Sequence, residues 1–228
     1  MSTVKIAIDG PAGAGKSTIS KAIAETLDFI YIDTGAMYRT VALKAITNHI
    51  DTKDAQAVCS VLDDLNITIR YDKNGQVIFL NGKDVTKEIR TPDVSIGASD
   101  VAVIPEVRLK LVQLQRELAS DNNVVMDGRD VGTYVLPDAD IKIFLTASVD
   151  DRAKRRYEEM LEKGCEYSLN EIKKDIEYRD QNDRNRAFAP LKIAEDAVVL
   201  DTSGNELHES IEMILKVIMG KMNKNNEK

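Results

Sequence analysis

An eight-residue segment near the start of the chain carries the residue types that bind phosphate groups. It consists of Gly10, Pro11, Ala12, Gly13, Ala14, Gly15, Lys16 and Ser17, with Thr18 directly after it. Glycines let the backbone wrap closely around an anion, the lysine reaches terminal phosphates, and the serine hydroxyl can ligate Mg²⁺. The motif predicts a nucleoside triphosphate site with Mg²⁺ at Ser17, against the alternative of a glycine-rich turn without a ligand.

Two further segments place carboxylates and an arginine directly after short apolar runs. Residues 33–39 read DTGAMYR, and residues 127–130 read DGRD. Ligands of open α/β sheets bind outside the carboxyl ends of the strands, where such segments converge. A single arginine or aspartate there could be a cap or a solvated residue. Two such clusters beside the phosphate motif favour a binding site.

Arginines are concentrated in two later stretches of the chain. They are Arg152, Arg155 and Arg156 in the first stretch and Arg179, Arg184 and Arg186 in the second. Arginine offers planar, bidentate donors to phosphate oxygens. For Arg152 alone, the favoured interpretation is a solvated helix face with Glu158 and Glu159 as partners. For Arg179 and Arg186, which have few apolar neighbours in sequence, phosphate binding is favoured.

A dedicated catalytic base is not evident among these groups. An alcohol acceptor usually has a positioned carboxylate near its hydroxyl. A phosphate monoester, whose second pKa is about 6, is already a dianion at neutral pH and can attack directly. The arginines therefore favour a phosphate acceptor, although Asp33 or Asp127 could act as a base.

The predicted elements alternate between strands and helices, which places these motifs at one edge of a parallel sheet. Strands are expected over residues 4–8, 29–32, 124–126, 141–145 and 198–200. Helices are expected over 17–27, 36–48, about 107–118, 150–163, from the capping box at 168–171, and over 206–219. Residues 67–71 and 77–80, with turn signals at Asn74-Gly75 and Asn81-Gly82, predict a small antiparallel insert.

Composition is that of an ordinary globular protein and narrows the class of partner. The chain has 228 residues, a formal net charge of −7, 43% hydrophobic residues and 30% charged residues. This acidic balance disfavours a nucleic-acid partner. No run of 18 apolar residues and no signal segment is present, so we expect a cytoplasmic protein that does not contact a membrane. Nothing demands a protein partner, and a monomer is expected.

Cysteine and histidine usage argues against metal or nucleophile chemistry. Cys59 and Cys165 lie far apart, outside any metal-like spacing, and we interpret them as reduced thiols. His49 and His208 are isolated, which disfavours a zinc site or a Ser-His pair.

Taken in order, these segments resemble bacterial cytidylate kinases over essentially the whole chain. The resemblance rests on residues 8–17, 33–39, 127–133, 179–186 and 189–191 and on the β insert. It implies an α/β, three-layer P-loop fold with a parallel central sheet, in one domain over residues 1–228. Residues 60–100 would form an inserted NMP-binding subdomain, and residues 150–190 a short helical lid with its flanking helices. The implied reaction transfers phosphate from ATP with Mg²⁺ to CMP or dCMP.

The resemblance also implies a role for individual residues. Arg39, Arg129 and Arg186 would hold the CMP phosphate, Arg179 and Asp183 would contact the ribose, and Thr34, Arg108 and Asp130 would read the base. Lys16, Arg129, Arg179 and Arg186 would act in catalysis, and Arg155 and Arg156 would contact ATP phosphates or the moving group. Some members of the family have Ser at the position of Thr34. The hydroxyl is kept, whereas the added methyl group bears on the shape of the pocket and on the CMP to dCMP ratio.

Base chemistry independently favours cytosine, and several rival functions remain. A carboxylate suits the exocyclic amine of cytosine but would oppose the O4 acceptor of uracil. The main rival is a kinase for AMP, UMP or a metabolite alcohol. A nucleotide switch or scaffold is a rival of another class, although the chain lacks the Asn-Lys-x-Asp motif of GTPases and its insert shows no large apolar stripe.

Overall fold

The protein is built around a five-stranded parallel sheet. The computed structural model describes residues 3–72, 75–162, 164 and 167–226. The strands follow the spatial order β2-β6-β1-β7-β8. Their bounds are β1 Lys5–Asp9, β2 Ile30–Asp33, β6 Val124–Gly128, β7 Ile141–Thr146 and β8 Val198–Asp201. Every neighbouring pair runs parallel, which confirms the predicted sheet.

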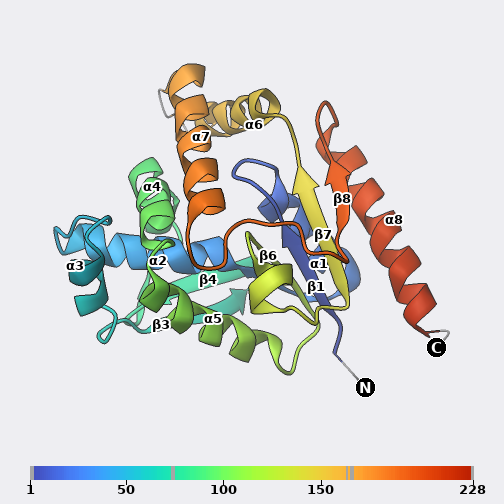
Figure 1. Ribbon diagram of the computed structural model, residues 1–228. Coiled ribbons are helices and arrows are strands. Elements are labelled where there is room, and N and C mark those ends of the chain that lie inside the picture. The colour runs from blue at the N-terminus through green and yellow to red at the C-terminus, as the bar shows by residue number, and fades with distance from the viewer. Residues whose placement is uncertain (1–2, 73–74, 163, 165–166, 227–228) are drawn as a thin grey trace.

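Helices cover both faces of this sheet, because successive strand residues point to opposite sides. On one face, Ile6 and Ile8 pack with α1 (Lys16–Leu27) and with Ile214 and Ile218 of α8 (Leu207–Asn226). On the other face, Ala7 packs with α2 (Thr34–Thr47) and α5 (Pro105–Ala119). Figure 1 shows this layering, which turns the carboxyl ends of the strands toward α6 and α7.

The loop between β1 and α1 fits tightly against the sheet, and Gly10 is the reason it can. A Cβ at Gly10 would lie 2.0 Å from the main-chain oxygen of Leu145 on β7. Gly13 and Gly15 adopt φ values of 75° and 81°, which favour glycine. The glycines of the phosphate motif therefore allow a close approach and a left-handed path.

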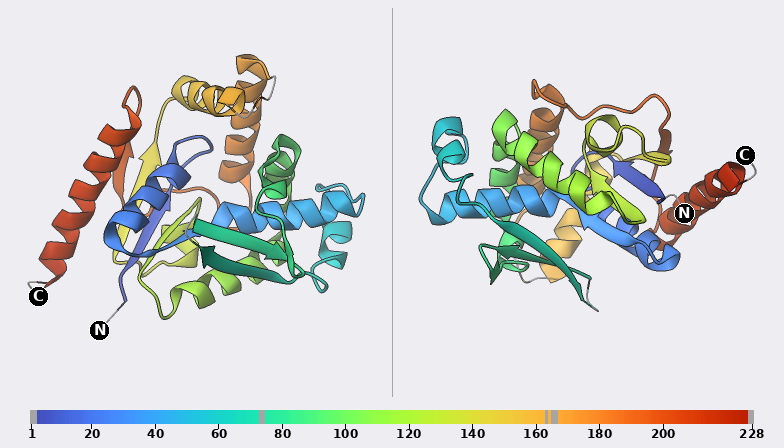
Figure 2. Two further views of the ribbon diagram at one scale, coloured as in Figure 1. Left: turned by 180° about the vertical axis from the view of Figure 1, so that it is seen from behind. Right: turned by 90° about the horizontal axis from the view of Figure 1, so that it is seen from below.

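The insert forms a separate three-stranded antiparallel sheet beside β2, as Figure 2 shows. Its strands are β3 Ile67–Asp72, β4 Gly75–Leu80 and β5 Lys83–Asp84, and the short helix α3 (Ala55–Ser60) precedes them. Asn81 and Gly82 both have positive φ, 49° and 82°, which confirms the second predicted turn. Asn74 of the first turn signal lies outside the described residues.

Prolines begin helices where the sequence pattern suggested only boundaries. Pro92 and Pro105 occupy the first turns of α4 (Pro92–Val101) and α5, and the Thr91 side chain caps α4. Proline suits this position because its missing N–H would have no helical partner there. Helix α4 was not predicted from the sequence, since its residues carry no clear apolar period.

Two helices form the pair that overhangs the sheet edge. They are α6 (Val149–Glu162) and α7 (Leu169–Asn185), and the capping box predicted at Ser168 and Glu171 is confirmed. A short 3₁₀ turn, η1 (Glu88–Arg90), and a π-helical turn, η2 (Val131–Val135), complete the elements near this edge.

Two remaining expectations concern thiols and membranes. Cys59 is a free thiol, whereas Cys165 lies outside the described residues. Within the described ranges, no helix is both long and apolar enough to cross a membrane.

Candidate active site

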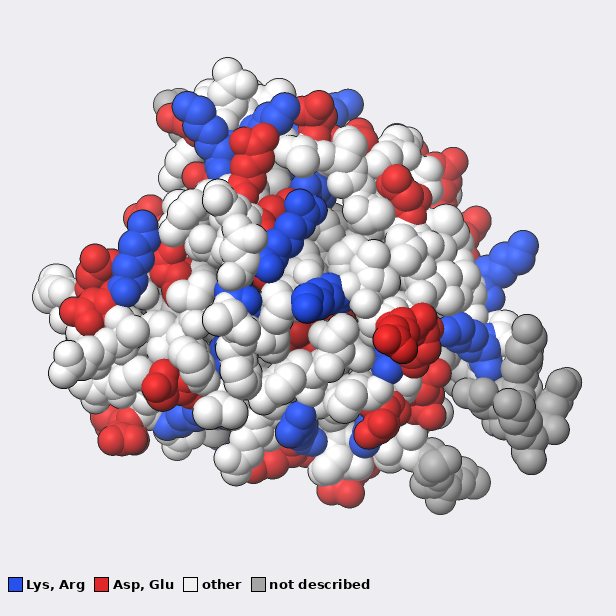
Figure 3. All heavy atoms as spheres, in the orientation of Figure 1, with Lys and Arg blue, Asp and Glu red and all other residues white. Residues whose placement is uncertain are grey.

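A cavity of about 620 Å³ opens at the carboxyl edge of the sheet. The phosphate motif, the start of α2, the end of β6 and the α6–α7 pair form its walls. Figure 3 shows basic side chains gathered in this hollow, although the chain as a whole is acidic. The charge in the cavity thus suits a bound anion.

The phosphate motif contributes the floor of the cavity. Residues 13–18 line it, while Gly10, Pro11 and Ala12 lie behind them. The Nζ of Lys16 donates to the carbonyl of Pro11 at 2.7 Å. Burial and the charge of Arg129 lower the pKa of Lys16 below its usual value. A bound phosphate would reverse this shift, because an adjacent anion favours the ammonium form.

Asp127 at the end of β6 lies against the motif serine. The Ser17 hydroxyl donates to Oδ2 of Asp127 at 2.9 Å, and the Tyr31 hydroxyl donates to Oδ1 at 2.8 Å. Burial, and then the charge of Asp33, raise the pKa of Asp127. Hydroxyl and carboxylate oxygens side by side form a donor set that suits a hard cation such as Mg²⁺.

Arg152 is a buried structural residue, and its predicted place on a solvated helix face was wrong. The side chain is 2% exposed, and Nη2 lies 2.8 Å from Oδ2 of Asp180 on α7. Its Nη1 donates to the carbonyl of Ala12 at 2.7 Å, while Oδ1 of Asp180 accepts from the Ala12 amide at 3.1 Å. One peptide segment of the phosphate motif is therefore held by both overhanging helices. The helical spacing of charges around Arg152 could not predict this ion pair, because Asp180 lies 28 residues away in sequence.

Asp33 pairs with two arginines at the opposite wall. Its Oδ2 accepts from Arg39 at 2.7 Å and from Arg90 at 3.0 Å, and its Oδ1 caps α2 at the amide of Ala36, 2.9 Å away. Burial alone would raise the pKa of Asp33, but Arg39 and Arg90 outweigh it and lower the pKa to about 2. Such a carboxylate is a weak base at neutral pH, so Asp33 does not suit proton abstraction.

Asp130 joins two arginines that come from distant parts of the chain. Arg108 of α5 donates to Oδ2, and Arg186 donates to Oδ1 at 2.9 Å. Thr34 lies nearby and donates its hydroxyl to the main-chain oxygen of Asp127 at 2.7 Å. Thr34, Asp130 and Arg186 line the cavity, whereas Arg108 is fully buried one layer behind the wall.

Asp183 and Arg129 form a third pair. The Nε of Arg129 donates to Oδ2 of Asp183 at 2.6 Å. Arg179, one helical turn before Asp183, makes no hydrogen bond or ion pair with another described residue. Burial and the charge of Arg129 lower the pKa of Arg179 to about 10. A guanidinium in the wall that donates no hydrogen bond to a described residue is available to an incoming anion.

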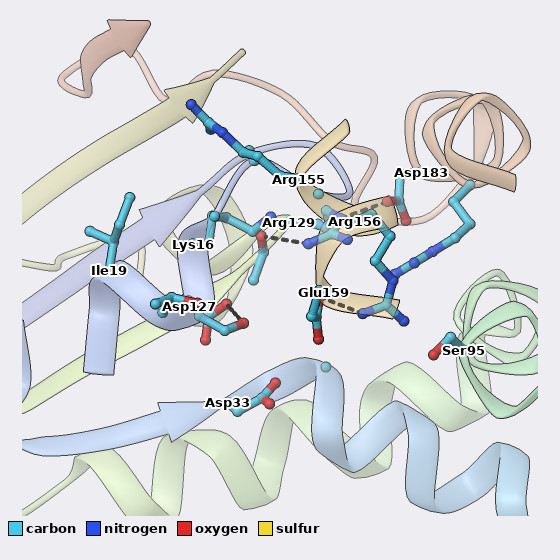
Figure 4. A pocket seen from close by; sticks show the side chains of 18 of the residues that line it. Lys16, Ile19, Asp33, Ser95, Asp127, Arg129, Arg155, Arg156, Glu159 and Asp183 are labelled. Atoms are coloured by element: carbon cyan, nitrogen blue, oxygen red, sulfur yellow. Dashed lines mark hydrogen bonds and ion pairs between the residues drawn. The ribbon is translucent and has the colours of Figure 1, made fainter. Parts of the chain in front are cut away.

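Arg155 and Arg156 lie apart from these pairs. Arg155 donates to the main-chain oxygens of Thr202 and Asn205, and residues 204–207 line that end of the cavity. Arg156 pairs with Glu159 at 2.7 Å. In Figure 4, Lys16, Arg129 and Arg156 lie around one open space, and Arg155 lies nearer β7.

The fold thus brings most of the predicted site residues to one cavity, with Gly10, Pro11, Ala12 and Arg108 behind its wall, and it adds others. Asp9, directly before the motif, accepts from the amides of Val131 and Gly132 at 2.8 and 2.7 Å and so fixes the loop that carries Asp130. Burial raises the pKa of Asp9 to about 6 despite these bonds. Arg90 and Tyr31 were also missed. No motif surrounds Arg90, whereas an acidic residue next to Gly10 was a usable signal for Asp9.

Comparison with known proteins agrees with this geometry. The family described as cytidylate kinase matches residues 6–220. A cytidylate kinase of Caldicellulosiruptor saccharolyticus is 50% identical over 217 residues, which cover 95% of this chain and 96% of that protein. A cytidylate kinase of Oceanobacillus iheyensis is 49% identical over 224 residues, which cover 98% and 97%.

Solved structures extend the comparison to the fold. A gluconokinase of Sinorhizobium meliloti superposes with a TM-score of 0.53 at 14% identity, covering 99% of this chain and 97% of its own. An uncharacterized protein of Eubacterium ventriosum gives a TM-score of 0.54 at 13% identity, covering 95% and 98%. At these identities the likeness concerns the fold alone. The match to the family profile and the near-full-length identities go further, and they show that the chain belongs to the cytidylate kinase family.

Proposed function

We propose that the protein transfers the terminal phosphate of ATP to CMP and dCMP, giving ADP and CDP or dCDP. The observation that carries this proposal is the set of cavity-lining arginines opposite the phosphate motif, formed by Arg39, Arg129, Arg179 and Arg186. Such a set suits a second phosphate group facing the first. Membership of the cytidylate kinase family supports CMP as the compound that bears it.

The donor nucleotide would occupy the half of the cavity next to α1. Main-chain N–H groups of residues 13–18 and the positive end of α1 would hold the phosphates, with Lys16 at the transferred group. The end lined by residues 204–207, beside Arg155, would receive the adenosine part. Arg156 lies between the two halves, where it can contact the moving group after release from Glu159.

The Mg²⁺ ion fits the oxygen pair formed by Ser17 and Asp127. These residues would hold it, and the ion would neutralise charge on the donor phosphates. Because Asp127 must be ionised for this purpose and its pKa is raised, we expect Mg²⁺ to lower that pKa. Carboxyl ¹³C NMR of the protein, with and without Mg²⁺ and ATP, measures the shift, and Asp127→Asn assigns the signal.

The acceptor would bind between α2, β6 and α7. Its phosphate would exchange the carboxylate partners of Arg39, Arg129 and Arg186 for its own oxygens. The ribose would lie at Arg179 and Asp183, and the base at Thr34 and Asp130, with Arg108 behind. The hydroxyl and the carboxylate suit the cytosine amine.

The transfer itself needs no proton abstraction. A phosphate oxygen of CMP attacks the γ-phosphorus of ATP, and the bond from that phosphorus to the β–γ bridging oxygen breaks as ADP leaves. Lys16 and the arginines offset the charge that spreads over the moving group. We propose that residues 60–100 form the NMP-binding subdomain and that residues 150–190 form a lid whose closure excludes water, the competing acceptor.

An acceptor panel tests the proposal directly. ADP formation from ATP and Mg²⁺ is followed with CMP, dCMP, UMP, AMP, GMP and no acceptor. We expect strong turnover with CMP and dCMP and little elsewhere. Equal slow turnover in every tube would indicate an ATPase and would overturn the proposal, while preference for AMP or UMP would change the acceptor. The predicted cytoplasmic location and monomeric state stay predictions, and light scattering after gel filtration measures the latter.

A further inference from the structure

The guanidinium group of Arg108 is held between two aromatic rings. Its Cζ lies 5.5 Å from the ring centroid of Tyr38 on α2 and 5.9 Å from that of Phe188. The Arg108 side chain is 0% exposed, so the attraction between its charge and the ring faces acts without competition from water. Aromatic faces thus restrict the guanidinium on two sides.

The same guanidinium orients a residue of the cavity wall. Arg108 donates to Oδ2 of Asp130 through Nη2, and to the carbonyl of Ala102 at 3.2 Å through Nη1. Asp130 lines the cavity, whereas neither Arg108 nor Phe188 does. Any displacement of Arg108 therefore reaches a ligand through the carboxylate of Asp130.

Phe188 is itself fixed by a tight turn that follows α7. The Nε of Arg186 donates to the carbonyl of Ala189 at 2.7 Å, and Ala189 has a φ of 47°. The ring of Phe188 also packs edge to face against Tyr134, at a centroid distance of 5.0 Å and an angle of 73°. Tyr134 belongs to η2, which begins directly after Asp130. The ring thus bridges the end of α7, η2 and Arg108.

We propose that Phe188 is a positioning residue for base selection, acting through Arg108 on the carboxylate of Asp130. The proposal rests on the proposed function, in which Asp130 accepts a hydrogen bond from the cytosine amine. Uracil carries an oxygen acceptor at that position, so a fixed carboxylate opposes it. Once the ring face is removed, Arg108 is held less firmly, and Asp130 can turn away from an unfavourable base.

The signature of this role is a change in selectivity and not a general loss of activity. Donor binding depends on the phosphate motif, which Phe188 does not contact. The ratio of kcat/KM for CMP to kcat/KM for UMP should therefore fall, while KM for ATP stays within about twofold. A full cation–π contact at a desolvated site corresponds to an effect of about thirtyfold. Because Arg108 keeps its contacts with Tyr38, Ala102 and Asp130 in the variant, we expect the ratio to fall by a smaller factor, roughly three- to tenfold.

Three variants of the full chain test the proposal. Phe188→Leu removes the ring and should lower the ratio. Phe188→Tyr keeps the ring face, and its ratio should stay within about twofold of that of the unmodified protein. The matched control is Phe29→Leu, because Phe29 packs against the hydrophobic core between α1 and the sheet, outside the cavity and outside residues 60–100 and 150–190. This control should leave the ratio unchanged. Thermal melts of each variant separate selectivity from stability.

Several outcomes would overturn the role of Phe188. An unchanged ratio in Phe188→Leu, or an equal loss for CMP and UMP, contradicts it, as does an equal fall in Phe29→Leu. If Phe188→Leu does not fold, Phe188→Met removes the aromatic face with a flexible side chain that adapts to the space left, and the same ratio decides. An unmodified enzyme that shows no preference for CMP would instead count against the proposed function.

Discussion

In the proposed function, the two halves of the cavity would bind phosphate by different means. The half beside α1 offers main-chain N–H groups and one lysine, all within residues 13–18. The half beside α2 and α7 offers arginine side chains, most of which already rest on Asp33, Asp130 or Asp183. The first half is preformed by backbone geometry, whereas the second must exchange internal ion pairs for a ligand.

This difference has an energetic meaning. A preformed set of donors loses little freedom on binding, so most of its interaction energy appears as affinity. A paired arginine must leave a carboxylate before it gains a phosphate, and the carboxylate must then find another partner. The acceptor half therefore gains selectivity more than raw affinity, because only a ligand that satisfies several pairs together offsets their loss.

The largest effect on activity is expected from removal of the Lys16 side chain in the donor half of the cavity. We expect Lys16→Ala to lower kcat about a thousandfold, since it removes a charge at the transferred group. The fold should persist, because Lys16 is buried with a lowered pKa and its removal leaves no carboxylate without a partner. Steady-state kinetics and circular dichroism together measure both effects. Near-normal turnover would contradict the assigned role.

The next prediction concerns the ion pair of Arg152 and Asp180, which joins α6 and α7 to the phosphate motif. Arg152→Met leaves Asp180 buried without its main partner, and we expect a loss of about 3 kcal/mol in the free energy of unfolding. Urea denaturation measures it. The double variant Arg152→Met with Asp180→Leu removes both charges and should recover part of the loss. A double variant less stable than the single one would argue against the pair.

A pH series sharpens the description of the acceptor half. The folded pKa of Asp33, about 2, lies below its usual value of 3.8, so its ion pairs stabilise the protein above about pH 4 and are lost as pH falls toward 2. We expect Asp33→Asn to destabilise the protein by about 2 kcal/mol at pH 6, and the difference from the unmodified protein should shrink below pH 4. Thermal melts between pH 6 and pH 3 follow it. A constant difference would contradict the role of the Asp33 charge, because asparagine retains an oxygen that can cap α2.

The smallest expected effect is on the discrimination between the bases of CMP and UMP. Asp130→Asn replaces an oxygen acceptor with an amide that can donate to O4 of uracil, so we expect discrimination between CMP and UMP to fall about tenfold. Asp130→Ala should relax it as well. The ratio of kcat/KM values provides the measurement, and Asp138→Asn, outside the cavity, is the control. Full discrimination in both variants would exclude Asp130 as a base reader.

The same contrast explains how far the sequence could predict the molecule. The phosphate motif is contiguous, so its strand, loop and helix followed from local rules. The residues of the acceptor half were found largely through family resemblance, and their pairing was not predictable because Arg186 and Asp130 are joined only by the fold. Arg152 was misassigned for this reason, since a charged helix face looks solvated until Asp180 is placed. Arg90 carried no signal, because its role depends entirely on the carboxylate of Asp33.

The hydrogen bond between Asp180 and Ala12 couples α7 to the phosphate loop. Asp180 is the point of attachment, and Leu169 at the start of the helix lies 11 residues away, or about 16 Å along the axis. A rotation of α7 by roughly 10° about this point would displace the Leu169 end by about 3 Å. A small shift of the phosphate loop on nucleotide binding would therefore produce a larger displacement at the outer end of the helix. The exposed side chain of Leu169 is accordingly a good place for a fluorescent reporter of nucleotide arrival.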